Sequence, residues 1–145
     1  MTRINIVDPK ELTDQHLVAE YREIFMVGSS LQRSLASPNW DVKKIPAQFT
    51  LNKGHVSFFY DKGEYLHKRY KALIREMKKR GMNPDKDRVF LREQWPDELY
   101  KDWKATERDR DIVRERINDR INSKPGWYRY YGEEIAESKE WLEIP

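Results

Sequence analysis

TDQHLVAEYREIFMVGSSLQRSL, residues 13–35, is the stretch that decides the fold. Its apolar residues recur every three or four positions, as they do on one face of an α-helix. They are Leu17, Tyr21, Ile24, Gly28, Leu31 and Leu35. Asp8 before Pro9, or Thr13 with Asp14, suits an N-cap, and Pro38 ends the pattern. We therefore predict one long helix whose apolar stripe faces a core.

The polar side of this helix carries chemically useful groups. At about 100° per residue, Gln15, Arg22 and Arg33 fall opposite the stripe, and His16 and Glu23 lie on its flank. Such a face is most often solvated surface with ion pairs. The N-terminus weighs against that interpretation here, because it offers a second reactive group near the start of the chain.

That reactive group is an α-amine. An initiator methionine is commonly removed before a small residue, and the second residue is Thr2. Removal leaves Thr2 with a free α-amine, whose pKa is about 7.7–8.0. About a seventh of such amines are neutral at pH 7, against well under ~0.1% of lysines. The α-amine of Thr2 is therefore a candidate nucleophile.

The composition limits which fold classes and which cellular compartments we expect for this chain. The 145 residues are enough for one domain with a single core, and 37% charged against 38% hydrophobic residues suits helices better than a two-sided sheet. The net charge of +3 is too small to identify a nucleic-acid partner by itself. No apolar run approaches the roughly 18 residues of a spanning helix, and MTRINIVDPK at the start lacks the apolar core of a signal peptide. We expect a soluble, cytoplasmic protein.

The metal-ligating residue types are scarce. The chain has no cysteine, which excludes disulfides, thiolate zinc ligands and a cysteine nucleophile. The three histidines, His16, His55 and His67, show no paired metal-ligand spacing. We expect neither a metal nor another cofactor.

Two further helices are predicted, over residues 64–79 with Gly81 as the stop, and over residues 106–123. The stretches that remain are a turn-rich loop at 37–52, a segment at 53–63 that alternates like a strand without a partner strand, and a polar, irregular segment at 83–104 without a legible role. In the acidic tail, Trp141 is a candidate docking anchor.

The third helix and the segment after it are rich in arginine and aromatic residues. The arginines of the helix alternate with Asp and Glu, so any one of them is equally expected to form a surface ion pair or to bind a ligand. WYRYYG at residues 127–132 places four rings around an arginine, which is typical of a surface that stacks bases and binds phosphate. The alternative is that Trp127 and Tyr130 close the core, and we expect two of the four rings to do so.

Four separated motifs together resemble the phage endonuclease V family, the pyrimidine-dimer DNA glycosylases with AP-lyase activity. They are TRIN at residues 2–5, LTDQHLVAEYREI at 12–24, GHVSFFYDK at 54–62 and WYRYYG at 127–132. The match covers nearly the whole chain in order and spacing. The resemblance implies a compact, all-α single domain over residues 1–145, with three main helices, long irregular loops, no sheet and no metal.

The resemblance also implies a reaction. The α-amine of Thr2 would attack the anomeric carbon of the 5′ sugar of a cyclobutane pyrimidine dimer, release the base and hold the sugar as a Schiff base. Elimination would then cut the strand. Glu23 would stabilise positive charge on the sugar and the imine and assist proton movement. The alternative is a non-catalytic module that kept the scaffold and binds damaged DNA.

The expected partner is double-stranded DNA containing pyrimidine dimers or abasic sites, bound by a monomer and away from any membrane. Positions that the resemblance or the helix face assigns to DNA contact are Arg3, Gln15, His16, Arg22, Arg33, Arg116, Arg120, Lys124, Trp127, Tyr128, Arg129 and Tyr130. The family is implied to kink the duplex and to flip an adenine into a protein cavity. One departure is that Phe25 and Met26 stand where the family pattern has Pro-Arg, so an expected basic group is missing.

Overall fold

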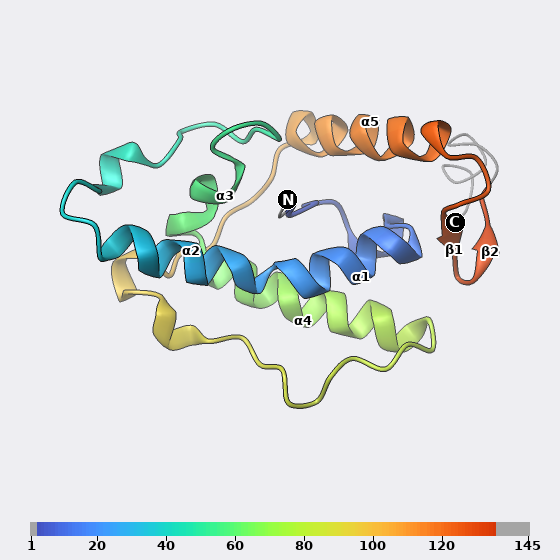
Figure 1. The fold of residues 1–145 in the computed structure, drawn as a ribbon, viewed down its shortest axis with the longest axis horizontal. Coiled ribbons are helices and arrows are strands. Elements are labelled where there is room, and N and C mark those ends of the chain that lie inside the picture. Colours follow the sequence, from blue (N-terminus) through green and yellow to red (C-terminus); the bar gives the residue numbers. More distant parts are fainter. Residues whose placement is uncertain (1–2, 136–145) are drawn as a thin grey trace.

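The structure, a computed structural model, describes residues 3–135 and is mostly helical (Figure 1). Its α-helices are α1 (Asp14–Glu23), α2 (Phe25–Leu35), α3 (His55–Phe58), α4 (Gly63–Lys79) and α5 (Glu107–Ser123). Short 3-10 helices occupy Pro9–Glu11, Val42–Lys44, Phe59–Asp61, Arg92–Gln94 and Asp97–Leu99. The predicted helical fold is confirmed. Trp141, the candidate docking anchor, lies outside the described residues.

A small hairpin corrects the prediction of no sheet. Strand β1 (Arg129–Tyr130) pairs with β2 (Glu133–Glu134) in antiparallel register, with Tyr130 opposite Glu133. The two residues between the strands, Tyr131 and Gly132, have φ of 51° and 81°. Positive φ at both central positions is the geometry of a type I′ turn, whose twist matches that of paired strands. Gly132 adopts this geometry without strain, whereas Tyr131 is a non-glycine residue in the left-handed region.

The predicted long helix is two helices that meet at Ile24. This residue keeps helical backbone angles, φ −56° and ψ −31°, and its N–H donates to the carbonyl of Glu20 at 2.9 Å. The next turn is tighter, because the N–H of Val27 reaches back only three residues, to the carbonyl of Ile24 at 3.4 Å. Hydrophobic periodicity continues through such a one-residue interruption and therefore does not reveal it. The interruption leaves Glu23 as the last residue of α1.

The segment that alternates like a strand is helical. It forms α3 and the 3-10 helix that follows, and Phe58, Phe59 and Tyr60 are buried in succession. A one-faced strand would bury every second residue, whereas a short helix inside a core buries neighbours on all sides. The absence of a partner strand in the sequence agrees with this outcome.

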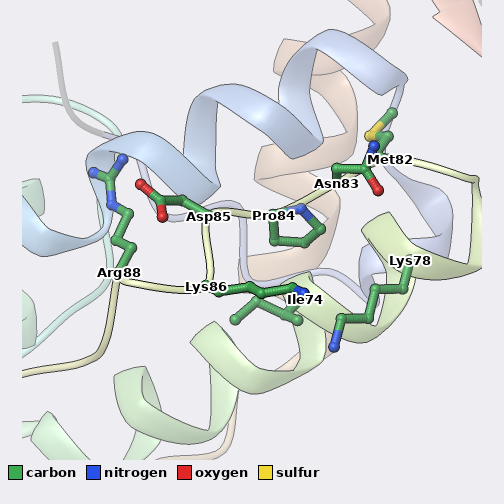
Figure 2. A pocket seen from close by; sticks show the side chains of 8 residues that line it. All are labelled: Ile74, Lys78, Met82, Asn83, Pro84, Asp85, Lys86 and Arg88. Carbon is green, nitrogen blue, oxygen red and sulfur yellow. The ribbon is translucent and has the colours of Figure 1, made fainter.

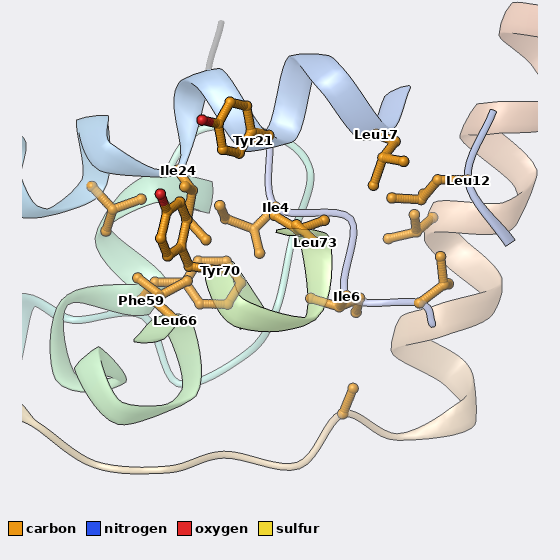
Figure 3. Close-up of a cluster of buried hydrophobic side chains, with 14 of the residues drawn as sticks. Ile4, Ile6, Leu12, Leu17, Tyr21, Ile24, Phe59, Leu66, Tyr70 and Leu73 are labelled. Carbon is orange, nitrogen blue, oxygen red and sulfur yellow. The ribbon is translucent and has the colours of Figure 1, made fainter. Parts of the chain in front are cut away.

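One hydrophobic core joins the N-terminal segment to α1, α2, α4 and α5. Figure 3 shows Ile4 of this segment between Tyr21 of α1 and Ile24, where α1 and α2 meet, on one side and Leu73 of α4 on the other. In Figure 1 the same segment, in blue, runs between α1 and α5. The start of the described chain is therefore an internal part of the fold. None of the described helices is long and apolar enough to cross a membrane.

Trp95 attaches the irregular segment after α4 to the core. Its indole is only 2% exposed and lies against Gly63, where an added Cβ would come within 2.7 Å of the ring. Gly28 of α2 faces the same residue pair, Gln94 and Trp95. Glycine is needed at Gly63, because a Cβ there would meet the rigid indole ring, whereas at Gly28 it would meet the flexible end of the Gln94 side chain. The segment is irregular, as predicted, and part of it packs against α2 and α4.

Candidate active site

Two buried side chains hold the N-terminal segment by its backbone. The N–H of Ile4 donates to Nε2 of His55 at 2.8 Å, and the N–H of Asn5 donates to Oε1 of Glu20 at 3.0 Å. His55 comes from α3 and Glu20 from α1, so the two anchors approach from different elements. Backbone groups that are bonded in this way hold a segment in one register even where it has no regular structure.

Glu20 is itself neutralised by Arg69 of α4. The guanidinium donates from Nε to Oε2 at 2.7 Å and from Nη2 to Oε1 at 3.0 Å, and both side chains are almost wholly buried. Arg69 also donates to the carbonyl of Val7. A buried charge is tolerated when it is paired and fully hydrogen-bonded. The pair therefore connects α1, α4 and the N-terminal segment.

These contacts maintain a strained turn in the N-terminal segment. Ile6 has φ 48°, which costs a β-branched residue on the order of 1–3 kcal/mol. The turn is closed by the N–H of Val7, which donates to the carbonyl of Asn5. Before the turn, successive side chains lie in different surroundings. Arg3 and Asn5 line a cavity, while Ile4 lies in the core.

His55 is a neutral link in this arrangement. Because Nε2 accepts the N–H of Ile4, Nδ1 carries the proton and donates to the carbonyl of Thr50 at 2.8 Å. Burial lowers the pKa of His55 to about 4; the bond to Thr50 acts in the opposite direction, and the charge of Arg3 lowers it further. Sequence reasoning considered His55 only for metal spacing and missed this role, since its partners are remote in sequence.

The neutral His55 predicts a loss of stability in mild acid. A histidine whose pKa is lower in the folded than in the unfolded chain stabilises the fold above about pH 6.5 and loses this contribution as pH falls toward the folded value. From pH 7 to pH 5, His55 alone is expected to remove about 2 kcal/mol from the free energy of unfolding. Urea unfolding at both pH values measures the change. His55→Gln, which retains a donor and an acceptor, should show a smaller dependence, and an equal dependence in both proteins would contradict the prediction.

Glu23 lies in a cavity of about 200 Å³ between the N-terminal segment, α1 and α5. Arg3, His16 and Arg116 line the same cavity. The carboxylate of Glu23 is half-buried and makes no hydrogen bond or ion pair with the residues that the structure describes. Its negative charge acts on the guanidinium groups of Arg3 and Arg116. It is therefore a carboxylate that the described protein leaves available to a substrate.

The arginines of α5 divide into two classes. Arg110 and Arg114 form ion pairs with neighbouring carboxylates, so for these two arginines the surface ion pair is the correct alternative. Arg116 and Arg120 form none with any described residue. Burial, and then the like charges of Arg3 and Arg120, lower the pKa of Arg116. Cations gathered without matching carboxylates attract an anion, and DNA phosphate is such an anion.

His16 connects this cavity to the segment after α5. Its ring stacks on Tyr128 with centroids 4.9 Å apart and planes 9° apart. Nδ1 lies 2.5 Å from the hydroxyl of Thr13, which is also the N-cap of α1. Burial lowers the pKa of His16 to about 4, and Arg116 and Arg120 lower it further. His16 is thus neutral at pH 7 and adds no charge to the cation cluster.

Gln15 and Asp14 bind the hairpin region to α1. The amide of Gln15 donates to the carbonyl of Trp127 at 2.7 Å and accepts the N–H of Arg129 at 2.9 Å. The carboxylate of Asp14 accepts the N–H groups of both turn residues of the hairpin, at 3.1 Å and 2.9 Å. The structure thus gives Gln15 a positioning contact, and Asp14 is a second such residue that the sequence did not single out.

The remaining predicted DNA contacts fall into two sets. Arg22, Trp127 and Arg129 line a second cavity, of about 490 Å³, and Lys124 lies 5.8 Å from the ring centre of the half-exposed Trp127. Trp127 therefore does not close the core. Two other predicted residues lie apart from both cavities: Tyr130 is buried with its hydroxyl donating to the carbonyl of Lys10 at 2.7 Å, and Arg33 is exposed on α2.

Thr2, the candidate nucleophile, lies outside the described residues, and its neighbour Arg3 lines the Glu23 cavity. Residues 1–89 match the protein-family model described as pyrimidine dimer DNA glycosylase. The chain belongs to this family. The predicted resemblance is thereby confirmed, and the protein is placed among DNA repair glycosylases that act on DNA containing pyrimidine dimers. The matched residues of the glycosylase supply Arg3, His16 and Glu23, and α5, beyond the match, supplies Arg116.

Proposed function

We propose that this glycosylase is bifunctional: it releases the 5′ base of a cyclobutane pyrimidine dimer through a Schiff base on Thr2 and then cuts the strand as an AP lyase. The observation that carries the proposal is the carboxylate of Glu23, which has no partner among residues 3–135 and lies in a cavity shared with Arg3. Thr2 is covalently adjacent to Arg3, and neighbouring Cα atoms are ~3.8 Å apart. The proposal therefore pairs the α-amine of Thr2, the residue that precedes Arg3 in the chain, with the carboxylate of Glu23.

The chemistry divides between these two groups. The neutral amine of Thr2 forms a bond to C1′ while the bond from C1′ to the base breaks, and the base departs with the bonding electrons. Loss of the amine proton and opening of the sugar ring give the imine. Removal of a proton from C2′ then expels the 3′ oxygen with its phosphate, and water releases the enzyme. Glu23 stabilises the cationic sugar and accepts the C2′ proton.

Substrate binding is assigned to the two groups of cationic and aromatic residues. Arg3, Arg116 and Arg120 bind phosphates beside the reacting sugar, because they are close together and Arg116 and Arg120 lack carboxylate partners in the described chain. The cavity of about 490 Å³ beside Trp127 is assigned to a base flipped out of the duplex. An aromatic ring at the edge of a cavity can stack on such a base, and a dimer has already weakened its pairing.

Borohydride reduction tests the proposal. An imine between the glycosylase and a dimer-containing duplex is expected to be reduced to a stable covalent complex, and the undamaged duplex should give none. A binding titration with the same two duplexes is the parallel measurement. If the protein binds damaged DNA but neither traps nor cleaves it after removal of Met1, it is a damaged-DNA-binding module, and this proposal is wrong.

A further inference from the structure

Arg88 is held against the interruption between α1 and α2. Its guanidinium lies 4.3 Å from the ring centre of Phe25 and 5.3 Å from that of Tyr21. Nη2 donates to the carbonyl of Arg22 at 2.5 Å. The positive group is thus fixed over two ring faces, which attract cations, and beside the last carbonyl groups of α1, which carry partial negative charge.

The main chain around Arg88 is fixed as well. The N–H of Asp85 donates to the hydroxyl of Tyr21 at 2.9 Å, and the hydroxyl of Tyr70 donates to the carbonyl of Arg88 at 2.6 Å. Figure 2 shows the side chain of Arg88 leaving its segment toward α1, while Lys86 extends along the other side toward Ile74. The segment and α4 together line an open cavity of about 590 Å³, and Arg88 also contributes to its wall. The otherwise irregular segment therefore presents one guanidinium to α1.

The charge of Arg88 has no carboxylate partner among the described residues. Two acidic residues are close in sequence, but the carboxylate of Asp85 accepts the N–H of Asp87 at 2.9 Å instead. Arginines with a structural role in this protein behave differently, since Arg69 and Arg80 both pair with carboxylates inside the fold. Arg88 thus resembles Arg116 and Arg120, which also have no carboxylate partner among the described residues. Of its five N–H donors, only one makes a hydrogen bond to a described residue.

We propose that Arg88 binds a DNA phosphate next to Arg22, so that the segment at residues 82–90 is part of the DNA interface. The inference rests on DNA being the partner in the proposed function. Arg88 lies beside the turn of α1 that carries Arg22, because its guanidinium donates to the main-chain carbonyl of Arg22 itself. An arginine on this turn of α1 and another held beside the turn can bind the same stretch of DNA backbone. The rings of Tyr21 and Phe25 hold Arg88 in place before DNA binds.

A salt titration tests the inference with an undamaged duplex, so that its outcome does not depend on any catalytic step. The logarithm of affinity is measured against the logarithm of salt concentration for wild type, Arg88→Gln and Arg88→Lys. Each lost phosphate contact lowers the magnitude of the slope by about 0.9. Arg88→Gln is expected to show this decrease, and Arg88→Lys, which keeps the charge, is expected to retain most of the slope.

Arg75→Gln is the matched control, because Arg75 is an exposed α4 arginine that lines a different cavity with Asp8 and Pro9. It should leave the slope unchanged although it removes the same charge. If Arg88→Gln weakens binding at every salt concentration without changing the slope, Arg88 only supports the interruption of the helix, and the inference is overturned. If Arg88→Gln does not fold, Arg88→Met, which keeps apolar contact with the rings of Tyr21 and Phe25, takes its place: a slope smaller in magnitude by about 0.9 supports the inference, and an unchanged slope overturns it.

Discussion

Retention of Met1 is expected to abolish imine formation by the glycosylase. With Met1 attached, the nitrogen of Thr2 is an amide, whose lone pair is delocalised and does not attack the sugar. Thr2→Leu places a large residue second and should prevent removal of Met1. Because an enzyme that loses its nucleophile retains little activity, trapping and strand cleavage should fall on the order of a thousandfold or more.

Thr2→Ser is the control for this experiment, since a small second residue still permits removal of Met1 and leaves a free α-amine. Intact-mass measurement establishes the N-terminus of each protein before its activity is compared. DNA binding should be similar in all three proteins, because the cations of the cavity are unchanged. Full activity of Thr2→Leu with Met1 demonstrably attached would exclude the α-amine of residue 2 as the nucleophile.

Local pattern predicted most of the helices, because their apolar residues lie at helical spacing. It predicted α4 over residues 64–79 and α5 over 106–123, each within one residue of the observed bounds. It missed the interruption at Ile24, where the backbone angles remain helical and only the hydrogen bonds of the next turn change. It also missed the hairpin, whose strands contain two residues each and are too short to show alternation.

The candidate site, too, was predicted only where its residues follow a local sequence pattern. Residues of α1 that share a face, such as His16 and Glu23, were identified from helical spacing, and the structure brings them into one cavity with Arg3 and Arg116. The side chains that hold the N-terminal segment were missed, because they act over long sequence separations: 51 residues from Ile4 to His55. No local pattern records which distant residue will bond to a backbone N–H.

The basic group that was missing after Glu23 illustrates this limit most directly. The sequence shows Phe25 and Met26 there, without charge. The structure brings Arg88 to the same turn from 66 residues beyond Arg22, and one of the two uncharged residues, Phe25, is the ring on which the guanidinium lies. A substitution that removes a cation from a sequence motif is thus compatible with a cation at the same place in the fold.

Two carboxylates one turn apart on α1 have opposite roles, and this contrast gives the sharpest test of the site. Glu20 is buried and paired with Arg69, whereas Glu23 is half-buried in the cavity without a described partner. Glu20→Gln leaves the charge of Arg69 uncompensated and is expected to remove about 3–5 kcal/mol from the free energy of unfolding. Glu23→Gln removes no described contact, so urea unfolding should find its stability close to that of wild type.

Glu23→Gln should lose activity although it keeps its stability. The amide is nearly isosteric, but it neither stabilises a cationic sugar nor accepts the C2′ proton, so glycosylase and lyase rates should fall by about a hundred- to a thousandfold. Binding of the dimer-containing duplex should be retained or improved, because one negative charge beside Arg3 and Arg116 has gone. Single-turnover cleavage and a binding titration with the same duplex measure both quantities. If Glu23→Gln cleaved as fast as wild type, the carboxylate would be part of an ordinary polar helix face, and the catalytic group would have to be sought elsewhere in the cavity.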